Sequence, residues 1–155
     1  MPFQPALTPV DHQTRSDLFH AEMAPVLVEF IDVLGIEPPR EVLTQAVQYL
    51  PYVERALRDM AIADADDRSW LLARMMYFIG EYFAQRYGGV WYVCEAPGSL
   101  FGRCVVGKFT VPGATMIDPL EIAAAYVDLP CPRNLSELVG DIEHALSGPA
   151  RPGLH

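Results

Sequence analysis

Lysine is almost absent from this 155-residue chain, in which Lys108 is the only one. Arginine supplies the rest of the positive charge, and the 11 basic residues are outnumbered by 20 acidic ones, which gives a formal net charge of −9. Nucleic-acid-binding domains need a basic stripe that displaces counterions from phosphate. We therefore expect no nucleic-acid partner. Arginine without lysine, beside abundant alanine and proline, is typical of a GC-rich genome.

Cysteine is also scarce: the chain has Cys94, Cys104 and Cys131. Their number is odd, no two have CxxC spacing, and the four histidines do not cluster with them. A zinc site needs about four ligands at characteristic spacing, so we expect no metal. The glycines lack P-loop or Rossmann spacing and no GK[ST] follows them, so we expect no nucleotide and no other cofactor.

Long hydrophobic runs are missing, because charge or proline interrupts each apolar stretch before the ~18 residues that a bilayer requires. The first residues, MPFQPALTPVDHQTR, lack the basic and apolar regions of a signal peptide. We therefore expect a cytoplasmic protein without a membrane partner. Reduced thiols are then expected, with a Cys94–Cys104 disulfide as the alternative.

The composition is that of a packed globular chain, with 51% hydrophobic and 20% charged residues. We expect a flexible arm at 1–13, one globular domain at 14–147 and a frayed tail at 148–155. Proline, glycine and capping residues divide the domain into helices. The expected helices cover approximately residues 16–34, 39–50, 51–63, 68–87, 118–128 and 134–146.

The helix expected at 68–87 is apolar on nearly every side, which is typical of a helix buried in the middle of a domain. After Gly88-Gly89 the hydrophobic period changes to two, and the runs VWYVCE and RCVVGKFTV flank a turn-rich loop. We predict an α+β fold: five or six helices packed around the central apolar helix (68–87) and one antiparallel β-hairpin or small sheet (90–95, 103–111).

The hairpin's register is predicted from a loop centred on Ser99. The predicted opposite pairs are Trp91 with Gly107, Val93 with Val105, Cys94 with Cys104, and Glu95 with Arg103. Gly107 would then leave room for the indole. One face is assigned to the core: Trp91, Val93, Val105 and Phe109. The other, less buried face would carry Tyr92, Cys94, Cys104 and Val106.

Glu81 is a carboxylate in the middle of this apolar helix, and it follows Gly80. Because seven residues are nearly two helical turns, Arg74, Glu81 and Gln85 share one polar stripe. The leading interpretation is that the stripe faces water, or that Glu81 pairs with Arg74 or Arg86. The alternative is a small-molecule-binding or enzymatic pocket between the central helix and the hairpin. That pocket would use Glu81, Tyr82, Trp91 and Arg103.

Acidic residues are concentrated near the start of the chain, where the segment 16–39 contains no arginine or lysine. The acidic face consists of Asp17, Glu22, Glu29, Asp32 and Glu37. Acidic surfaces accelerate association with basic partners. This face predicts a binding site for another protein, basic in character.

The runs GEYFAQRYGGVWYV, GRCVVGKF, IDPLEIAAAYVD and LSELVGDIEHAL resemble, over residues 78–146, small bacterial helix-plus-hairpin domains. Some of those domains are immunity or accessory proteins of toxin systems. The acidic helical face and the absence of a catalytic constellation predict a cytoplasmic protein-interaction domain, and the resemblance implies an immunity-type or accessory binder. It carries over no catalytic residue, so an enzyme is the less favoured interpretation. A homodimer joined through hairpin edges or helix faces is a third hypothesis.

Overall fold

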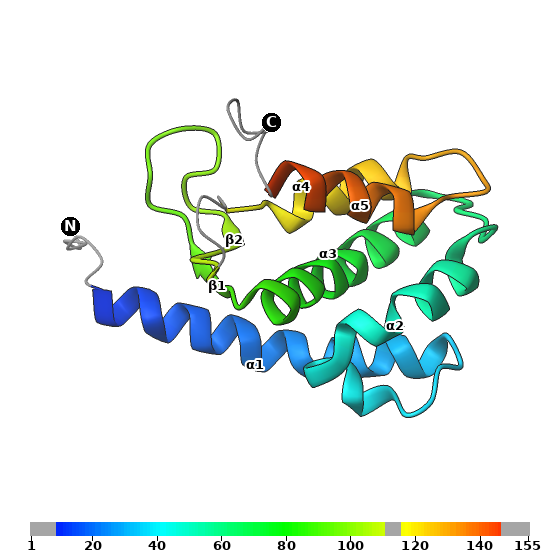
Figure 1. Cartoon of the computed structure of the whole chain (residues 1–155), viewed down its shortest axis with the longest axis horizontal. Coiled ribbons are helices and arrows are strands. Elements are labelled where there is room, and N and C mark those ends of the chain that lie inside the picture. Colours follow the sequence, from blue (N-terminus) through cyan, green and yellow to red (C-terminus); the bar gives the residue numbers. More distant parts are fainter. Residues whose placement is uncertain (1–8, 111–115, 147–155) are drawn as a thin grey trace, which may run out of the picture.

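The computed structural model describes residues 9–110 and 116–146, and for residues 9–17 it describes the backbone alone. Within that part of the chain there are five α-helices, a 3₁₀ turn and one antiparallel hairpin, which makes the fold α+β as predicted (Figure 1). The elements are α1 (Pro9–Val33), η1 (Pro39–Glu41), α2 (Val42–Leu57), α3 (Ala65–Tyr87), β1 (Val90–Val93), β2 (Cys104–Gly107), α4 (Pro119–Val127) and α5 (Leu135–Leu146). None of the helices in the described ranges is long and apolar enough to cross a membrane.

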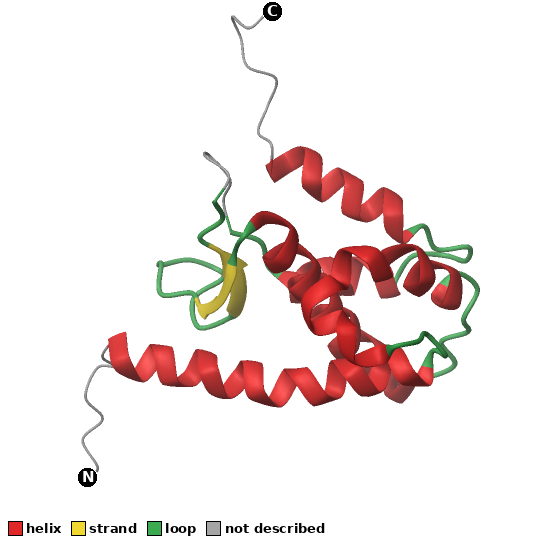
Figure 2. Ribbon diagram, turned by 60° about the horizontal axis from the view of Figure 1, so that its bottom comes forward, coloured by secondary structure: helices red, strands yellow, loops and turns green. Residues whose placement is uncertain are grey.

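The central helix is α3, which lies between α1 on one side and α4 and α5 on the other (Figures 1 and 2). It begins where the Asp64 side chain accepts a hydrogen bond from the amide of Asp67, and it ends at Gly88 in the left-handed conformation (φ 68°). The C-terminal end matches the prediction, whereas the helix begins three residues before the predicted Arg68. Six consecutive residues of α3, from Phe78 to Phe83, are buried. Because six residues go around the helix more than once, α3 contributes to the core on all sides.

The first helix is longer than predicted, because α1 begins at Pro9 rather than near Ser16 and continues through Pro25. Residues 9–13 of the expected arm are therefore helical, while residues 1–8 and the tail at 148–155 lie outside the described residues. The inner face of α1 buries Met23, Leu27, Phe30 and Ile31.

The predicted break at Leu50-Pro51 is wrong, because α2 continues through Pro51. A helical proline removes one amide donor, and here the buried residues on the inner face remain in phase on both sides of it. They are Val42, Ala46, Tyr49, Val53 and Leu57. The backbone of α2 departs from helical geometry earlier, at Gln45 (φ −133°, ψ 33°).

The hairpin exists, but its strands are shorter than predicted and the predicted register is wrong by one residue. The observed partners are Val90 with Gly107, Trp91 with Val106, Tyr92 with Val105, and Val93 with Cys104. The loop sets this register: the Cys94 amide donates to the Arg103 carbonyl, and Gly102, at φ 81°, donates back to the Cys94 carbonyl. Val106 and Cys104, rather than Val105, therefore share the face of Trp91.

Candidate functional site

The carboxylate of Glu81 is buried, with 4% of the residue exposed, and it accepts hydrogen bonds from two other side chains. The indole Nε1 of Trp91 donates to Oε1 over 2.8 Å, and the amide Nε2 of Gln85 donates to Oε2 over 3.2 Å. Nε2 of His20 lies 3.3 Å from Oε1. We call Glu81, Trp91, Gln85 and His20 the carboxylate cluster. It joins α1, α3 and β1.

Gly80 makes room for this arrangement. A Cβ atom at Gly80 would lie 1.9 Å from Cζ2 of Trp91, so the indole packs directly on the backbone of α3. The ring of Phe19 on α1 packs against the same indole, with centroids 4.9 Å apart. The space that Gly80 leaves open is therefore filled by a side chain of the protein itself.

The expectation that Glu81 faces water or pairs with an arginine is wrong. Arg74 stacks on Trp70 at 4.5 Å and donates to the Trp70 carbonyl, whereas Nε of Arg86 pairs with Glu143 at 2.8 Å. Gln85, assigned to the same polar stripe, also points inward. Its side chain donates to the Val42 carbonyl and accepts from the Ala46 amide, and so it fixes α2 against α3.

Of the four residues expected to line a pocket, the structure brings together Glu81 and Trp91 and places the other two elsewhere. Tyr82 points to α5, where its hydroxyl lies 3.4 Å from a Glu143 carboxylate oxygen. Burial, helped by that carboxylate, raises the pKa of Tyr82 to about 12. Arg103 pairs with Asp118 at 2.6 Å, and Asp118 also caps α4 by accepting from the Leu120 amide.

His20 is the member of the carboxylate cluster that sequence reasoning missed. Its side chain is 53% exposed, while the Glu81 side chain beside it is 5% exposed. The pair therefore couples a buried carboxylate to an imidazole that solvent can reach, which is the arrangement of a general base and its orienting group. Only tertiary packing joins the two, because no fixed sequence spacing links α1 to the middle of α3.

The acidic face predicted near the start of the chain is exposed where the structure describes it. The side chains of Glu22, Glu29, Asp32 and Glu37 are all exposed, and that of Asp17 lies outside the described part. Helical spacing places most of the outward residues of α1 along one line. We call this line the acidic stripe, and it consists of Leu18, Glu22, Pro25, Glu29, Asp32 and Val33.

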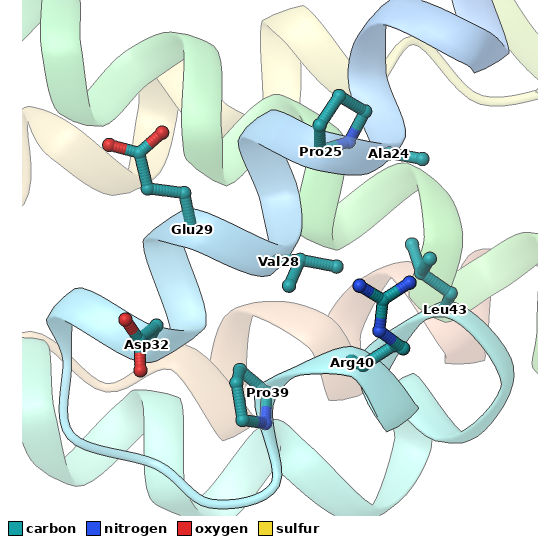
Figure 3. A pocket seen from close by; sticks show the side chains of 8 residues that line it. All are labelled: Ala24, Pro25, Val28, Glu29, Asp32, Pro39, Arg40 and Leu43. Atoms are coloured by element: carbon teal, nitrogen blue, oxygen red, sulfur yellow. The ribbon is translucent and has the colours of Figure 1, made fainter.

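A groove of about 520 Å³ runs beside the acidic stripe, between α1 and the start of α2 (Figure 3). Its lining combines apolar side chains with two carboxylates and one guanidinium. The lining residues are Ala24, Pro25, Val28, Glu29, Asp32, Pro39, Arg40 and Leu43. The sequence pointed to the two carboxylates but gave no signal for Arg40, which reaches the groove only because η1 turns back beside α1.

Comparison of the chain with family models, curated proteins and solved structures gives no match. In the described ranges, no three His, Cys, Asp or Glu side chains are grouped as metal ligands would be. The two features with functional geometry are the carboxylate cluster and the acidic stripe with its groove.

Proposed function

We propose that this protein is a cytoplasmic protein-interaction domain, of the immunity or accessory type, that binds a basic partner through the acidic stripe. The observation that carries the proposal is the composition of the stripe. Three carboxylates lie between Leu18 and Val33, two large apolar side chains that are 59% and 62% exposed. Apolar contact supplies affinity once water is excluded, and the carboxylates supply orientation and a faster encounter.

Pro25 adds a hydrogen-bond acceptor to the same surface. Because proline has no amide hydrogen, the carbonyl of Ala21 lacks the donor that residue 25 of a regular helix would supply. Ala21 and Pro25 are both exposed. A basic side chain of a partner docked on this surface would therefore have a carbonyl acceptor in addition to the carboxylates.

The test is a comparison of two triple variants in binding to the products of neighbouring genes. Glu22→Gln, Glu29→Gln and Asp32→Asn together neutralise the stripe without changing side-chain shape. Glu121→Gln, Glu137→Gln and Asp141→Asn remove the same charge from exposed positions of α4 and α5. We expect the first triple to slow association by about tenfold or more at low salt, and the second to have little effect.

Equal binding by the two triples would disprove the role of the stripe. If no neighbouring protein co-purifies with the wild-type chain at low salt, the interaction proposal itself fails. Circular dichroism of both triples checks that the fold is retained, which is expected because exposed isosteric changes alter stability by at most about 0.5 kcal/mol.

A second candidate function is a small-molecule or enzymatic site at the carboxylate cluster. The half-exposed His20 against the buried carboxylate of Glu81 favours it. It ranks second because Tyr82 and Arg103, which were expected to complete the site, contact Glu143 and Asp118. A His20→Gln variant that loses ligand binding while keeping its stability would move this candidate to first place.

A further inference from the structure

The groove beside the acidic stripe has its charges arranged in order along its length. In Figure 3 the carboxylates of Glu29 and Asp32 lie toward one end, and the guanidinium of Arg40 lies toward the other. Val28 lies between them, with Pro39 below. The groove therefore presents an anionic end, an apolar middle and a cationic end.

These charges are available to a ligand. Within the described part of the chain, Glu29, Asp32 and Arg40 make no ion pair or side-chain hydrogen bond with one another or with other residues. A ligand with complementary charges would therefore form new pairs without breaking existing ones. Partial removal of water by the apolar lining would strengthen those pairs relative to a flat surface.

We propose that the groove binds a segment of the partner polypeptide in which a basic, an apolar and an acidic side chain lie in that order along it. This inference rests on the proposed function, and it names the chemistry of the segment that is bound. The basic side chain pairs with Glu29 and Asp32, the apolar one packs on Val28, and the acidic one pairs with Arg40.

The separation of the charges favours a polypeptide over a free amino acid. In most free amino acids the only ammonium and carboxylate are attached to one carbon, so they cannot reach both ends of the groove. Free arginine or lysine has a more distant cation, but its unbranched stem offers less apolar surface to Val28 than a separate apolar side chain does. In an extended segment every second side chain lies on the same face, about 6.6 Å from the previous one, so residues i, i+2 and i+4 can supply all three groups. The volume of about 520 Å³ is also sufficient for several side chains.

The test uses two acetylated and amidated heptapeptides, Gly-Arg-Gly-Leu-Gly-Glu-Gly and its reversed order Gly-Glu-Gly-Leu-Gly-Arg-Gly, in which the three side chains share one face of an extended chain. Both are needed because the groove does not fix the direction of the bound chain. They are titrated to millimolar concentration into the ¹⁵N-labelled protein. We expect one of them to shift the amide resonances of Val28, Asp32 and Leu43 saturably. Replacing its leucine by serine should weaken binding about fivefold, because the apolar contact is lost.

A charge exchange tests the cationic end of the groove. Changing the peptide's glutamate to arginine should weaken its binding to the wild-type chain by about tenfold, and Arg40→Glu should reverse that preference. Arg40 is exposed, so this variant is expected to fold. Arg55→Glu, an equivalent change at an exposed position of α2 away from the groove, should keep the wild-type preference.

Three results would overturn the inference. These are no shift at the groove with either peptide, shifts that map elsewhere, and equal shifts from free arginine and leucine. None of them bears on the stripe itself. If the neutralised stripe loses its protein partner while the peptides fail to bind, the proposed function stands and only the identity of the bound segment is wrong. If the peptides bind and stripe neutralisation leaves partner capture unchanged, both proposals fail, because Glu29 and Asp32 belong to the groove as well as to the stripe.

Discussion

Gly80 and Trp91 are packed so closely that a Cβ atom at Gly80 would lie 1.9 Å from Cζ2 and 2.2 Å from Cη2 of the indole. This contact positions the indole Nε1 to donate to Glu81, the next residue of α3. The glycine and the glutamate in the middle of the apolar helix therefore serve one purpose. Together they seat the hairpin's tryptophan on α3.

Gly80→Ala should destabilise the protein, because the ring must move away from α3 and lose its hydrogen bond to Glu81. We expect a loss of about 1–3 kcal/mol in the free energy of unfolding, despite the better helix propensity of alanine. Denaturant unfolding followed by tryptophan fluorescence measures it. Gly140→Ala on α5 is the control: it meets no atom within 4 Å, and it should be neutral or stabilising.

Glu81→Gln should lower the free energy of unfolding by about 1–3 kcal/mol. The amide nitrogen of the new side chain would face a hydrogen-bond donor, from Trp91 or Gln85, where the carboxylate offered an acceptor. Trp91→Phe removes the indole donor and should have an effect of similar size. In a double-mutant cycle the two losses should be less than additive. A loss under about 0.5 kcal/mol for Glu81→Gln, the value typical of an exposed position such as Glu22, would contradict the buried cluster.

Trp91→Ala removes the buried indole altogether and should destabilise the protein by about 3–5 kcal/mol. Trp91 is 7% exposed, and its indole packs against Phe19 as well as α3. Thermal unfolding followed by circular dichroism measures the effect. Tyr52→Ala is the comparison, because Tyr52 is 53% exposed and its truncation should have a much smaller effect.

Deprotonation of Tyr126 should lower the free energy of unfolding at alkaline pH. Its hydroxyl is buried without a hydrogen-bond partner within the described residues, and burial raises its pKa from 10 to about 12. As pH rises, the unfolded chain therefore loses this proton before the folded chain does. The contribution of the protonated Tyr126 to the free energy of unfolding is complete below pH 10 and is lost between pH 10 and about 12. Tyr126→Phe should keep or raise stability at neutral pH and flatten this alkaline loss. A destabilisation of more than about 1 kcal/mol would reveal a partner for the hydroxyl.

The three thiols should react with an alkylating reagent at different rates in the native protein. Cys131 is exposed and should react first, whereas Cys104 is half-buried and burial raises its pKa. Cys94 is buried and should react last. The register places Cys104 opposite Val93, so a Cys94–Cys104 disulfide is not expected. Mass spectrometry after timed alkylation checks the order, and a disulfide between these two cysteines would show that the register is wrong.

The sequence by itself determined both ends of α4 and α5 and the C-terminal ends of α1 and α3 to within one residue. Asp64, Gly88 and Asp118 act at helix ends through hydrogen bonds to residues at most four positions away, so local sequence is sufficient. The apolar pattern of α3 likewise indicated a central helix and a mixed fold. Where such a local rule failed, at Pro51, the buried face of α2 held the helix together across a residue that usually interrupts one.

Tertiary structure alone decided the surroundings of Glu81 and the composition of the groove. His20 and Trp91 reach the carboxylate from two other elements, and Arg40 reaches the groove because η1 folds back beside α1. The hairpin register was also decided by the tertiary structure, since it depended on the conformation of Gly102 in the loop. The physical reason is range: caps and periodicity act within a few residues, whereas burial and long-range hydrogen bonds exist only after distant segments have packed.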